Sequence, residues 1–233
     1  MPLSEKQGIR SSTLRLATMR DANYPPNYKL SNLSDKNLIN YLMEKPHTYI
    51  GKKYKDFKGD VIEFGCGDGN NIKYFNSYNS YTFSDYEFKL FDEQNILNEN
   101  THQIKFDLIK DSYDQISNKY DLFLLFHTLE HIINPHEVLE SLFNALKPGG
   151  IIELIQPNDP SIVWNTGEWF GSFKANVDKK TYYYHQAREH VNPIKNLDRL
   201  IKYYFDDITI RDIPFRLNVL NLKLFRIYTI RKP

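Results

Sequence analysis

The sequence predicts an α/β fold of the doubly wound, Rossmann-like type, with a mostly parallel sheet that ends in an antiparallel hairpin. Three observations predict it. From residue 60 onward, short apolar runs alternate with polar stretches of helical character; three glycines follow the first run; and the last two runs lie too close together for a crossover helix. Continuous apolar strands are typical of a parallel sheet covered on both faces, which right-handed crossovers produce.

Composition sets the limits of this fold. The chain has 233 residues, 41% of them hydrophobic, which is enough for a substantial core. Its net charge of +1 creates no overall positive electrostatic field, which argues against binding of an extended nucleic acid. Cys66 is its single cysteine, so an intrachain disulfide is excluded and a reducing, cytoplasmic location is expected. The longest apolar runs are far shorter than the roughly 20 residues of a membrane span. Nothing in the composition fixes the oligomeric state.

The first 58 residues are expected to form an arm and a helix that cover the site, with the main domain at residues 59–233. Ser34 is a suitable N-cap, and apolar residues at helical spacing follow it, namely Leu38, Ile39, Leu42 and Met43. Pro46 is expected to end this helix, because proline lacks a backbone donor.

The main domain divides into strands and helices in alternation. Apolar strands are expected at residues 61–64, 80–85, 103–107, 120–126 and 151–155, with a final pair at 207–213 and 223–230. The best helix follows Asn134, a possible cap, with Pro135 at its first position and Glu137 where a capping box needs it. A second helix is expected at residues 196–205.

The first strand runs directly into a glycine-rich turn, "VIEFGCGDG". Gly65, Gly67 and Gly69 stand where a doubly wound sheet binds ligands, beyond the carboxyl end of a strand. A dinucleotide fold would have Gly-x-Gly-x-x-Gly, but Asn70 occupies the position of the last glycine. The turn therefore favours a ligand that needs close backbone approach without a pyrophosphate.

Two segments carry a family resemblance. "EFGCGDG" resembles the glycine turn of class I S-adenosylmethionine-dependent methyltransferases, and "YDLFLLFHTLEHIINP…LKPGGIIELIQPN" resembles their fourth strand, next helix and fifth strand. The resemblance covers roughly residues 60–158. It implies a seven-stranded sheet, a methyltransferase activity, S-adenosylmethionine as cofactor and S-adenosylhomocysteine as product.

The resemblance also implies a set of cofactor-binding residues. Asp85, at the end of the second strand, would accept the ribose hydroxyls, with Glu87 as the alternative, and Asp107 would accept from the adenine. The remaining cofactor candidates lie in or beside the turn and at strand ends: Glu63, Gly65, Cys66, Gly67, Gly69, Tyr86 and Phe126. The competing interpretation makes Asp85 and Asp107 ordinary turn acids and Cys66 a packing residue.

Histidines near strand ends are the candidates for catalysis, because a hydroxyl or a protonated amine needs a base before it can take a methyl group. His127 follows the fourth strand directly, His131 lies four residues on, and His190 and His185 lie in an insertion. A structural role is the alternative for each. "LEHI" resembles quinone O-methyltransferases in which a Glu-His pair holds a metal, which would implicate Glu130 and His131. No third carboxylate ligand is evident, so no metal is expected.

The insertion at about residues 159–192 is rich in aromatic side chains and is expected to form a lid over the acceptor. A separate hydrophobic cluster is the alternative. The aromatic residues are Trp164, Trp169, Phe170, Phe173, Tyr182, Tyr183 and Tyr184. The leading hypothesis is O-methylation of a small molecule or saccharide, as in surface-glycan or secondary-metabolite synthesis. A non-catalytic nucleoside-binding or scaffold module, and an RNA or protein methyltransferase, remain as alternatives.

Overall fold

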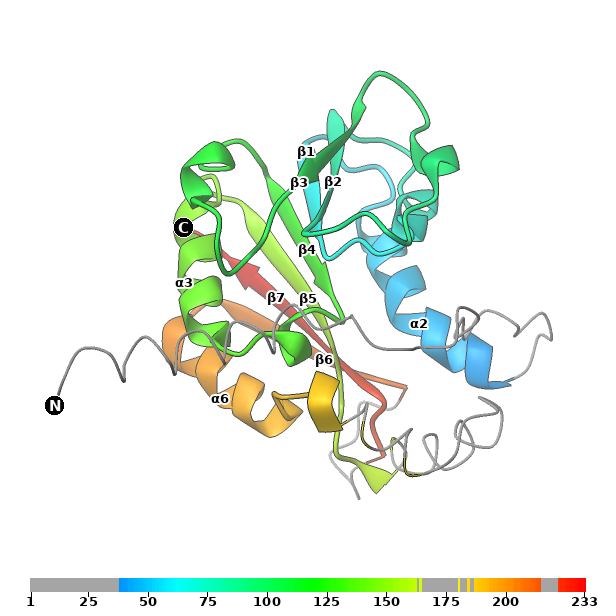
Figure 1. Cartoon of the computed structure of the whole chain (residues 1–233), viewed down its shortest axis with the longest axis vertical. Coiled ribbons are helices and arrows are strands. Elements are labelled where there is room, and N and C mark those ends of the chain that lie inside the picture. Colours follow the sequence, from blue (N-terminus) through cyan, green and yellow to red (C-terminus); the bar gives the residue numbers. More distant parts are fainter. Residues whose placement is uncertain (1–37, 163, 165–179, 181–183, 185–186, 215–221) are drawn as a thin grey trace, which may run out of the picture.

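A seven-stranded sheet forms the centre of the protein in the computed structural model, which describes residues 38–162, 164, 180, 184, 187–214 and 222–233 (Figure 1). Its strand order is β3-β2-β1-β4-β5-β7-β6. The strands are β1 (Asp60–Phe64), β2 (Ser80–Asp85), β3 (Thr101–Lys105), β4 (Leu122–Phe126), β5 (Ile151–Pro157), β6 (Ile208–Ile213) and β7 (Phe225–Arg231). The pairs among β1 to β5 are parallel, and β7 pairs antiparallel with β5 and β6. The predicted fold class and terminal hairpin are confirmed.

Helices lie on both faces of this sheet. Helix α2 (Leu38–Lys53) covers one face, and α3 (Pro135–Ala145) and α6 (Ile194–Tyr204) cover the other (Figure 1). The first three crossovers contain only short 3-10 turns, namely η1 (Asn70–Tyr74), η2 (Glu93–Asn95) and η3 (Tyr113–Gln115), whereas the turn η4 (Leu129–His131) precedes α3 in the fourth. The helical stretch expected after the glycine turn is therefore only the five-residue turn η1.

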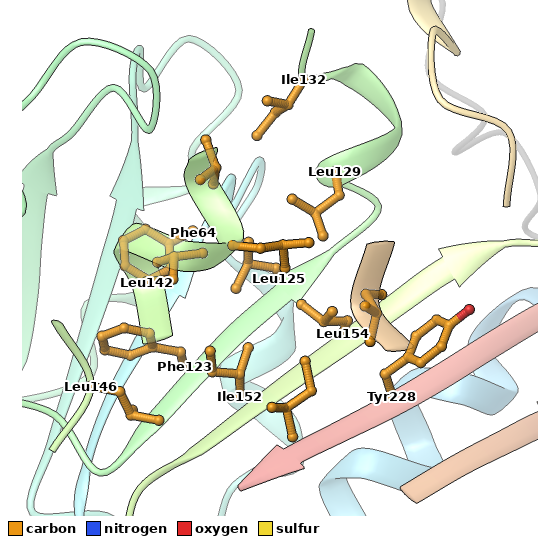
Figure 2. Packing of buried hydrophobic residues seen from close by; sticks show 14 of the residues in the cluster. Phe64, Phe123, Leu125, Leu129, Ile132, Leu142, Leu146, Ile152, Leu154 and Tyr228 are labelled. Atoms are coloured by element: carbon orange, nitrogen blue, oxygen red, sulfur yellow. The ribbon is translucent and has the colours of Figure 1, made fainter. Parts of the chain in front are cut away.

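Aliphatic and aromatic side chains from alternate strand positions fill the face beneath α3 and α6. Phe64, Phe123 and Leu125 meet Leu142 and Leu146 there (Figure 2). Each is at most 1% exposed, and burying such a side chain contributes about 1.5–3 kcal/mol. This packing holds the carboxyl ends of β1 and β4 at fixed positions, which is where the site lies.

The opposite face is tied to α2, whose course corrects one prediction. Pro46 lies inside α2 and does not end it. The helix continues because its last turn buries Ile50 against the sheet and Tyr54, the residue directly after it, is buried there as well. Buried Glu153 on β5 also accepts hydrogen bonds from Tyr54 Oη (2.6 Å) and Lys53 Nζ. These contacts outweigh the roughly 3 kcal/mol that an internal proline costs.

Two further boundaries differ from prediction. Strand β3 ends at Lys105, so Asp107 lies in the following turn. As an edge strand, β3 exposes three of its five side chains and lacks a continuous apolar run. At α3, Pro135 occupies the expected first position, but Asn134 makes no side-chain capping hydrogen bond, so the predicted capping box does not form. Among the described helices, none is long and apolar enough to cross a membrane.

Candidate functional site

The three glycines of the turn after β1 all have left-handed backbone conformations, with φ of 65°, 57° and 78° for Gly65, Gly67 and Gly69. Packing within the protein explains why Gly65 and Gly69 carry no side chain. A Cβ on Gly65 would lie 2.7 Å from Thr128 Oγ1, and one on Gly69 would lie 2.5 Å from the Phe91 ring. Among the residues that the structure describes, a Cβ on Gly67 would meet no atom within 4 Å. Gly67 is thus the point at which a ligand can approach the backbone.

Asp85 lies beside that open position. Its carboxylate, at the end of β2, accepts hydrogen bonds from the backbone N–H of Gly67 (3.3 Å) and of Glu87 (3.1 Å). The backbone N–H of Cys66 donates to the carbonyl of Ser84 (3.2 Å). These bonds hold the glycine turn against the end of β2, so a carboxylate lies next to the exposed backbone.

A recess of about 500 Å³ extends from the end of β2 to the turn after β3. It is lined by Tyr86, Glu87, Lys105, Asp107, Lys110 and Asp111. The Asp107 carboxylate accepts from the backbone N–H of Ile109 (3.0 Å) and pairs with Lys110 (2.9 Å). Asp107 therefore has the bonds of a turn acid and also lines the recess, and its contact with adenine stays a prediction.

Glu63 is buried beneath the turn. One of its carboxylate oxygens accepts from the Asn71 side-chain amide and the other from Tyr81 Oη (2.7 Å). Burial, reinforced by the nearby carboxylates, raises the pKa of Glu63 to about 7. Since both oxygens bond to protein groups, Glu63 holds the Asn71 side chain, and its contact with the cofactor stays a prediction.

Cys66 is also buried, at 4% exposure, and belongs to the core on the α2 side. Burial raises the pKa of its thiol well above the ordinary range. A thiol with a raised pKa supplies little thiolate at neutral pH, and the thiolate is the nucleophilic form. Cys66 thus has the surroundings of a packing residue whose backbone forms part of the turn.

His127 begins a second group of side chains, at the carboxyl end of β4. It adopts a left-handed conformation (φ 54°), and its backbone N–H donates to the carbonyl of Ile155 (2.9 Å). Its Nδ1 lies 3.7 Å from Glu130 Oε1, and its side chain is 31% exposed. Desolvation, together with the neighbouring His47, His131 and His190, lowers the pKa of His127 well below its usual value. A neutral imidazole at this strand end can accept a proton at pH 7.

The other two predicted catalytic histidines lie close to His127. The rings of His131 and His190 are 5.2 Å apart. His131 Nδ1 lies 2.8 Å from the carbonyl of Glu189, and His190 Nδ1 lies 3.0 Å from Asp159 Oδ2. The first bond joins η4 to the last part of the insertion, and the second joins that part to the segment that follows β5. The structure therefore brings together His127, His131 and His190, whereas His185 lies outside the described residues.

Glu130 lies among these histidines with its side chain only 3% exposed. Its Oε2 is buried and has no hydrogen-bond partner in the described part of the chain, and burial raises the pKa of this carboxyl to about 8. Its Oε1 is 4.0 Å from His131 Nε2. Within the described part of the chain, no three His, Cys, Asp or Glu side chains converge in a way that could hold a metal ion.

Sequence analysis missed His47. It lies in α2, with Nδ1 2.8 Å from Asn71 Oδ1 and its ring 5.4 Å from the rings of Phe126 and His127. Since Pro46 was expected to end the helix, His47 fell in a presumed loop. A signal was present: His47, Ile50 and Tyr54 have the spacing of one helical face.

Aromatic rings continue from His127 around the ends of β5 and β7. Phe225 lies 5.3 Å from His127 and 6.0 Å from Trp164, which lies 6.0 Å from His190. Of the predicted lid, Trp164 therefore packs beside the histidines. Trp169, Phe170, Phe173, Tyr182 and Tyr183 lie outside the described residues.

Comparison with known proteins gives a family and a fold. The model of a family described as a methyltransferase domain matches residues 35–202, more than half of the chain. A search of the curated proteins gives no significant match.

Solved structures share the fold at low identity. The plantazolicin methyltransferase BpumL, in complex with SAH, has a TM-score of 0.63 and 16% identity, covering 98% of this chain and 99% of its own. The N-methyltransferase NodS from Bradyrhizobium japonicum WM9 has a TM-score of 0.58 and 13% identity, with 83% and 98% covered. Phosphoethanolamine N-methyltransferase 2 from Haemonchus contortus, in complex with S-adenosyl-L-methionine, has a TM-score of 0.58 and 12% identity, with 81% and 52% covered.

Proposed function

The chain belongs to the methyltransferase-domain family, and from this premise we propose that it O-methylates a hydroxyl group of a small molecule or saccharide. It is a class I methyltransferase, and its cofactor is S-adenosylmethionine. That cofactor supplies a methyl group already activated on a sulfonium, which leaves alignment, exclusion of water and removal of the acceptor proton to the protein.

The residues around the glycine turn fit this cofactor. Gly67 leaves the backbone accessible, and the Asp85 carboxylate beside it can accept hydrogen bonds from ribose hydroxyls. The recess lined by Tyr86 and Asp107 is open for the base. We therefore propose that Gly67, Asp85, Tyr86 and Asp107 hold the cofactor, with Gly65, Cys66 and Gly69 shaping the turn, Glu63 supporting it from below and Phe126 beside it.

The single observation that carries O-methylation is the place of His127, a 31% exposed imidazole directly after β4 with its ring beside those of His47 and Phe225. The fold does not choose the methylated atom, because solved structures described as N-methyltransferases share it. A hydroxyl is a poor nucleophile until it loses its proton, and a histidine with a lowered pKa stays able to take that proton at pH 7. His131 and His190, whose rings are 5.2 Å apart, complete the proposed group of histidines near this base.

Aromatic and apolar walls favour a small, ring-bearing acceptor. Phe225, Trp164 and the histidine rings present flat faces on the acceptor side, and aromatic faces suit sugar rings and planar molecules. We further propose that the insertion at residues 159–192 covers this acceptor, since the hydrogen bond between His190 and Asp159 joins its two ends at the site. The proposed location is the cytoplasm, consistent with the single, buried cysteine.

The test starts from the full chain and a metabolite extract with S-adenosylmethionine labelled in its methyl group. We expect micromolar cofactor binding by calorimetry and transfer of label to an oxygen atom of an extract component, identified by mass spectrometry. His127→Asn is expected to bind the cofactor within about twofold of wild type and to transfer 10²-fold more slowly or worse.

His102→Asn serves as the control, because His102 is exposed on the edge strand β3. Equal turnover by His127→Asn and wild type would remove His127 as the base. Cofactor binding without transfer of label in any extract would favour the scaffold alternative, and label on nitrogen would replace O-methylation by N-methylation.

A further inference from the structure

A chain of hydrogen bonds runs from beneath the cofactor turn to His47. Tyr81 Oη donates to one oxygen of the buried Glu63, and the Asn71 amide nitrogen donates to the other. This orients the Asn71 side chain so that its carbonyl oxygen lies 2.8 Å from His47 Nδ1. A carbonyl oxygen can only accept, so the hydrogen of a neutral His47 lies on Nδ1 and Nε2 carries a lone pair.

The ring of His47 lies at the border between the two halves of the site. It packs edge-on against Phe126 at the end of β4 and lies 5.4 Å from the His127 ring. Burial is the main cause that lowers the pKa of His47, so the ring is neutral at pH 7. The charged groups that act on it are Glu44 on its own helix, Lys73 and Asp68 near the glycine turn, and His127 when protonated.

His47 is half-buried, so a bound molecule or water can reach part of its ring. His47 makes its hydrogen bond within the described residues through Nδ1 alone. Nε2 is on the side of the ring away from Asn71. A buried carboxylate thus holds Asn71, and Asn71 holds His47. This arrangement leaves Nε2 as an acceptor atom on a ring whose centre lies 5.4 Å from that of His127.

We propose that His47 is a specificity-determining residue that binds the methyl acceptor: its Nε2 accepts a hydrogen bond from an O–H or N–H group adjacent to the atom that receives the methyl group. This inference rests on the proposed function and narrows it. The acceptor carries two donor groups close together, one for His127 and one for His47, as a vicinal diol of a sugar or an aromatic ring does. An analogue whose second group is an ether would leave Nε2 unpaired and is expected to bind poorly.

The tautomer of His47 is measured first, because this requires neither an acceptor nor turnover. The full chain is labelled with ¹⁵N-histidine, and long-range ¹H–¹⁵N correlation spectra are recorded at pH 7, with the His47→Asn variant used to assign the signal. We expect a neutral ring with hydrogen on Nδ1. A ring with hydrogen on Nε2, or an imidazolium, would overturn the proposal.

Two substitutions then separate the ring nitrogens. His47→Asn keeps an amide donor at the position of Nδ1 and removes the acceptor at the position of Nε2, whereas His47→Gln can place an oxygen near that position. We expect His47→Asn to lower kcat/KM for the labelled extract component about 10- to 100-fold, mainly through KM. His47→Gln should recover part of the loss, and the cofactor Kd should change less than twofold in both.

The outcomes distinguish this inference from the proposed function. If wild type transfers label and His47→Asn transfers it with equal kcat/KM, His47 does not bind the acceptor and the methyltransferase assignment stands. If wild type binds the cofactor but transfers no label, the proposed function fails, while the spectra still decide whether the Nε2 lone pair exists. A tenfold weaker cofactor affinity in His47→Asn would also overturn the proposal, because His47 would then support the cofactor turn.

Discussion

The two halves of the site are built in different ways. The half that we propose for the cofactor uses the backbone of one turn and the ends of neighbouring strands, with Gly67, Asp85 and Asp107 in one stretch of the sequence. The half that we propose for the acceptor joins side chains from distant segments, including His47 on α2, His127 after β4 and Phe225 on β7. A site made by consecutive strands follows from chain order, whereas a site made by packing depends on which surfaces meet.

The largest expected effect tests the cofactor half. Asp85→Ala removes a carboxylate that we expect to accept two ribose hydroxyls, and such charged hydrogen bonds contribute about 1.5–3 kcal/mol each. We expect cofactor affinity to fall about 100-fold or more by calorimetry. Asp92→Ala is the control, since Asp92 also accepts a backbone N–H but lies exposed. Unchanged affinity in Asp85→Ala would refute the ribose assignment.

The next effect concerns the pH dependence of folding stability, which we expect from Glu130 beside the histidines. In the folded protein, burial raises the pKa of Glu130 to about 8, whereas the ordinary pKa of a glutamate side chain is 4.5. The folded state therefore binds a proton that the unfolded state releases, and stability falls as pH rises between these values. Glu63, with a pKa of about 7, adds to the same decline.

Glu130→Gln removes this titration. At about 1.4 kcal/mol per pKa unit, the rise from 4.5 to about 8 makes the variant more stable than wild type by about 5 kcal/mol at pH 9, on the order of 10–20 °C in Tm. The two should be similar at pH 4.5. Glu140→Gln on the exposed part of α3 is the control. Parallel Tm curves for Glu130→Gln and wild type would contradict the burial argument.

A third prediction compares two glycines that share a left-handed backbone conformation. Gly67 and Gly149 both have positive φ, and a Cβ on either meets no atom within 4 Å. Alanine at either position should therefore cost about 1–2 kcal/mol of folding stability. Only Gly67→Ala should also weaken cofactor binding, about 10-fold, because its methyl group would occupy the ligand's space. Equal Kd values for the two variants would mean that the cofactor does not approach Gly67.

The smallest effect is expected at His190. Its hydrogen bond to Asp159 joins the ends of the insertion, but His127 remains in place without it. His190→Ala, which removes the Nδ1 donor, should leave the cofactor Kd unchanged and slow transfer of label about 10-fold or less, in line with one lost hydrogen bond. A loss as large as that of His127→Asn would show that His190, too, takes part directly in proton removal.

Prediction from sequence succeeded where a residue's role depends on its chain neighbours. The apolar runs of β1, β2, β4 and β5 and the glycine turn were recognised because buried parallel strands and left-handed turns restrict which residues can stand there. It failed at Pro46, where helix propensity was outweighed by packing of Ile50 and Tyr54, and at β3, whose edge position weakens the apolar pattern. Missing His47 followed directly from the error at Pro46.

The sequence by itself determined the order of strands and helices, the family and the position of the cofactor turn, because backbone conformation and burial leave local patterns in residue choice. Only the tertiary structure decided which glycine is open to a ligand, that Glu63 holds Asn71, and that His47, His127 and His190 meet at one place. Contacts between side chains far apart in the chain leave no local pattern, since they arise only when the packed sheet and helices bring those surfaces together.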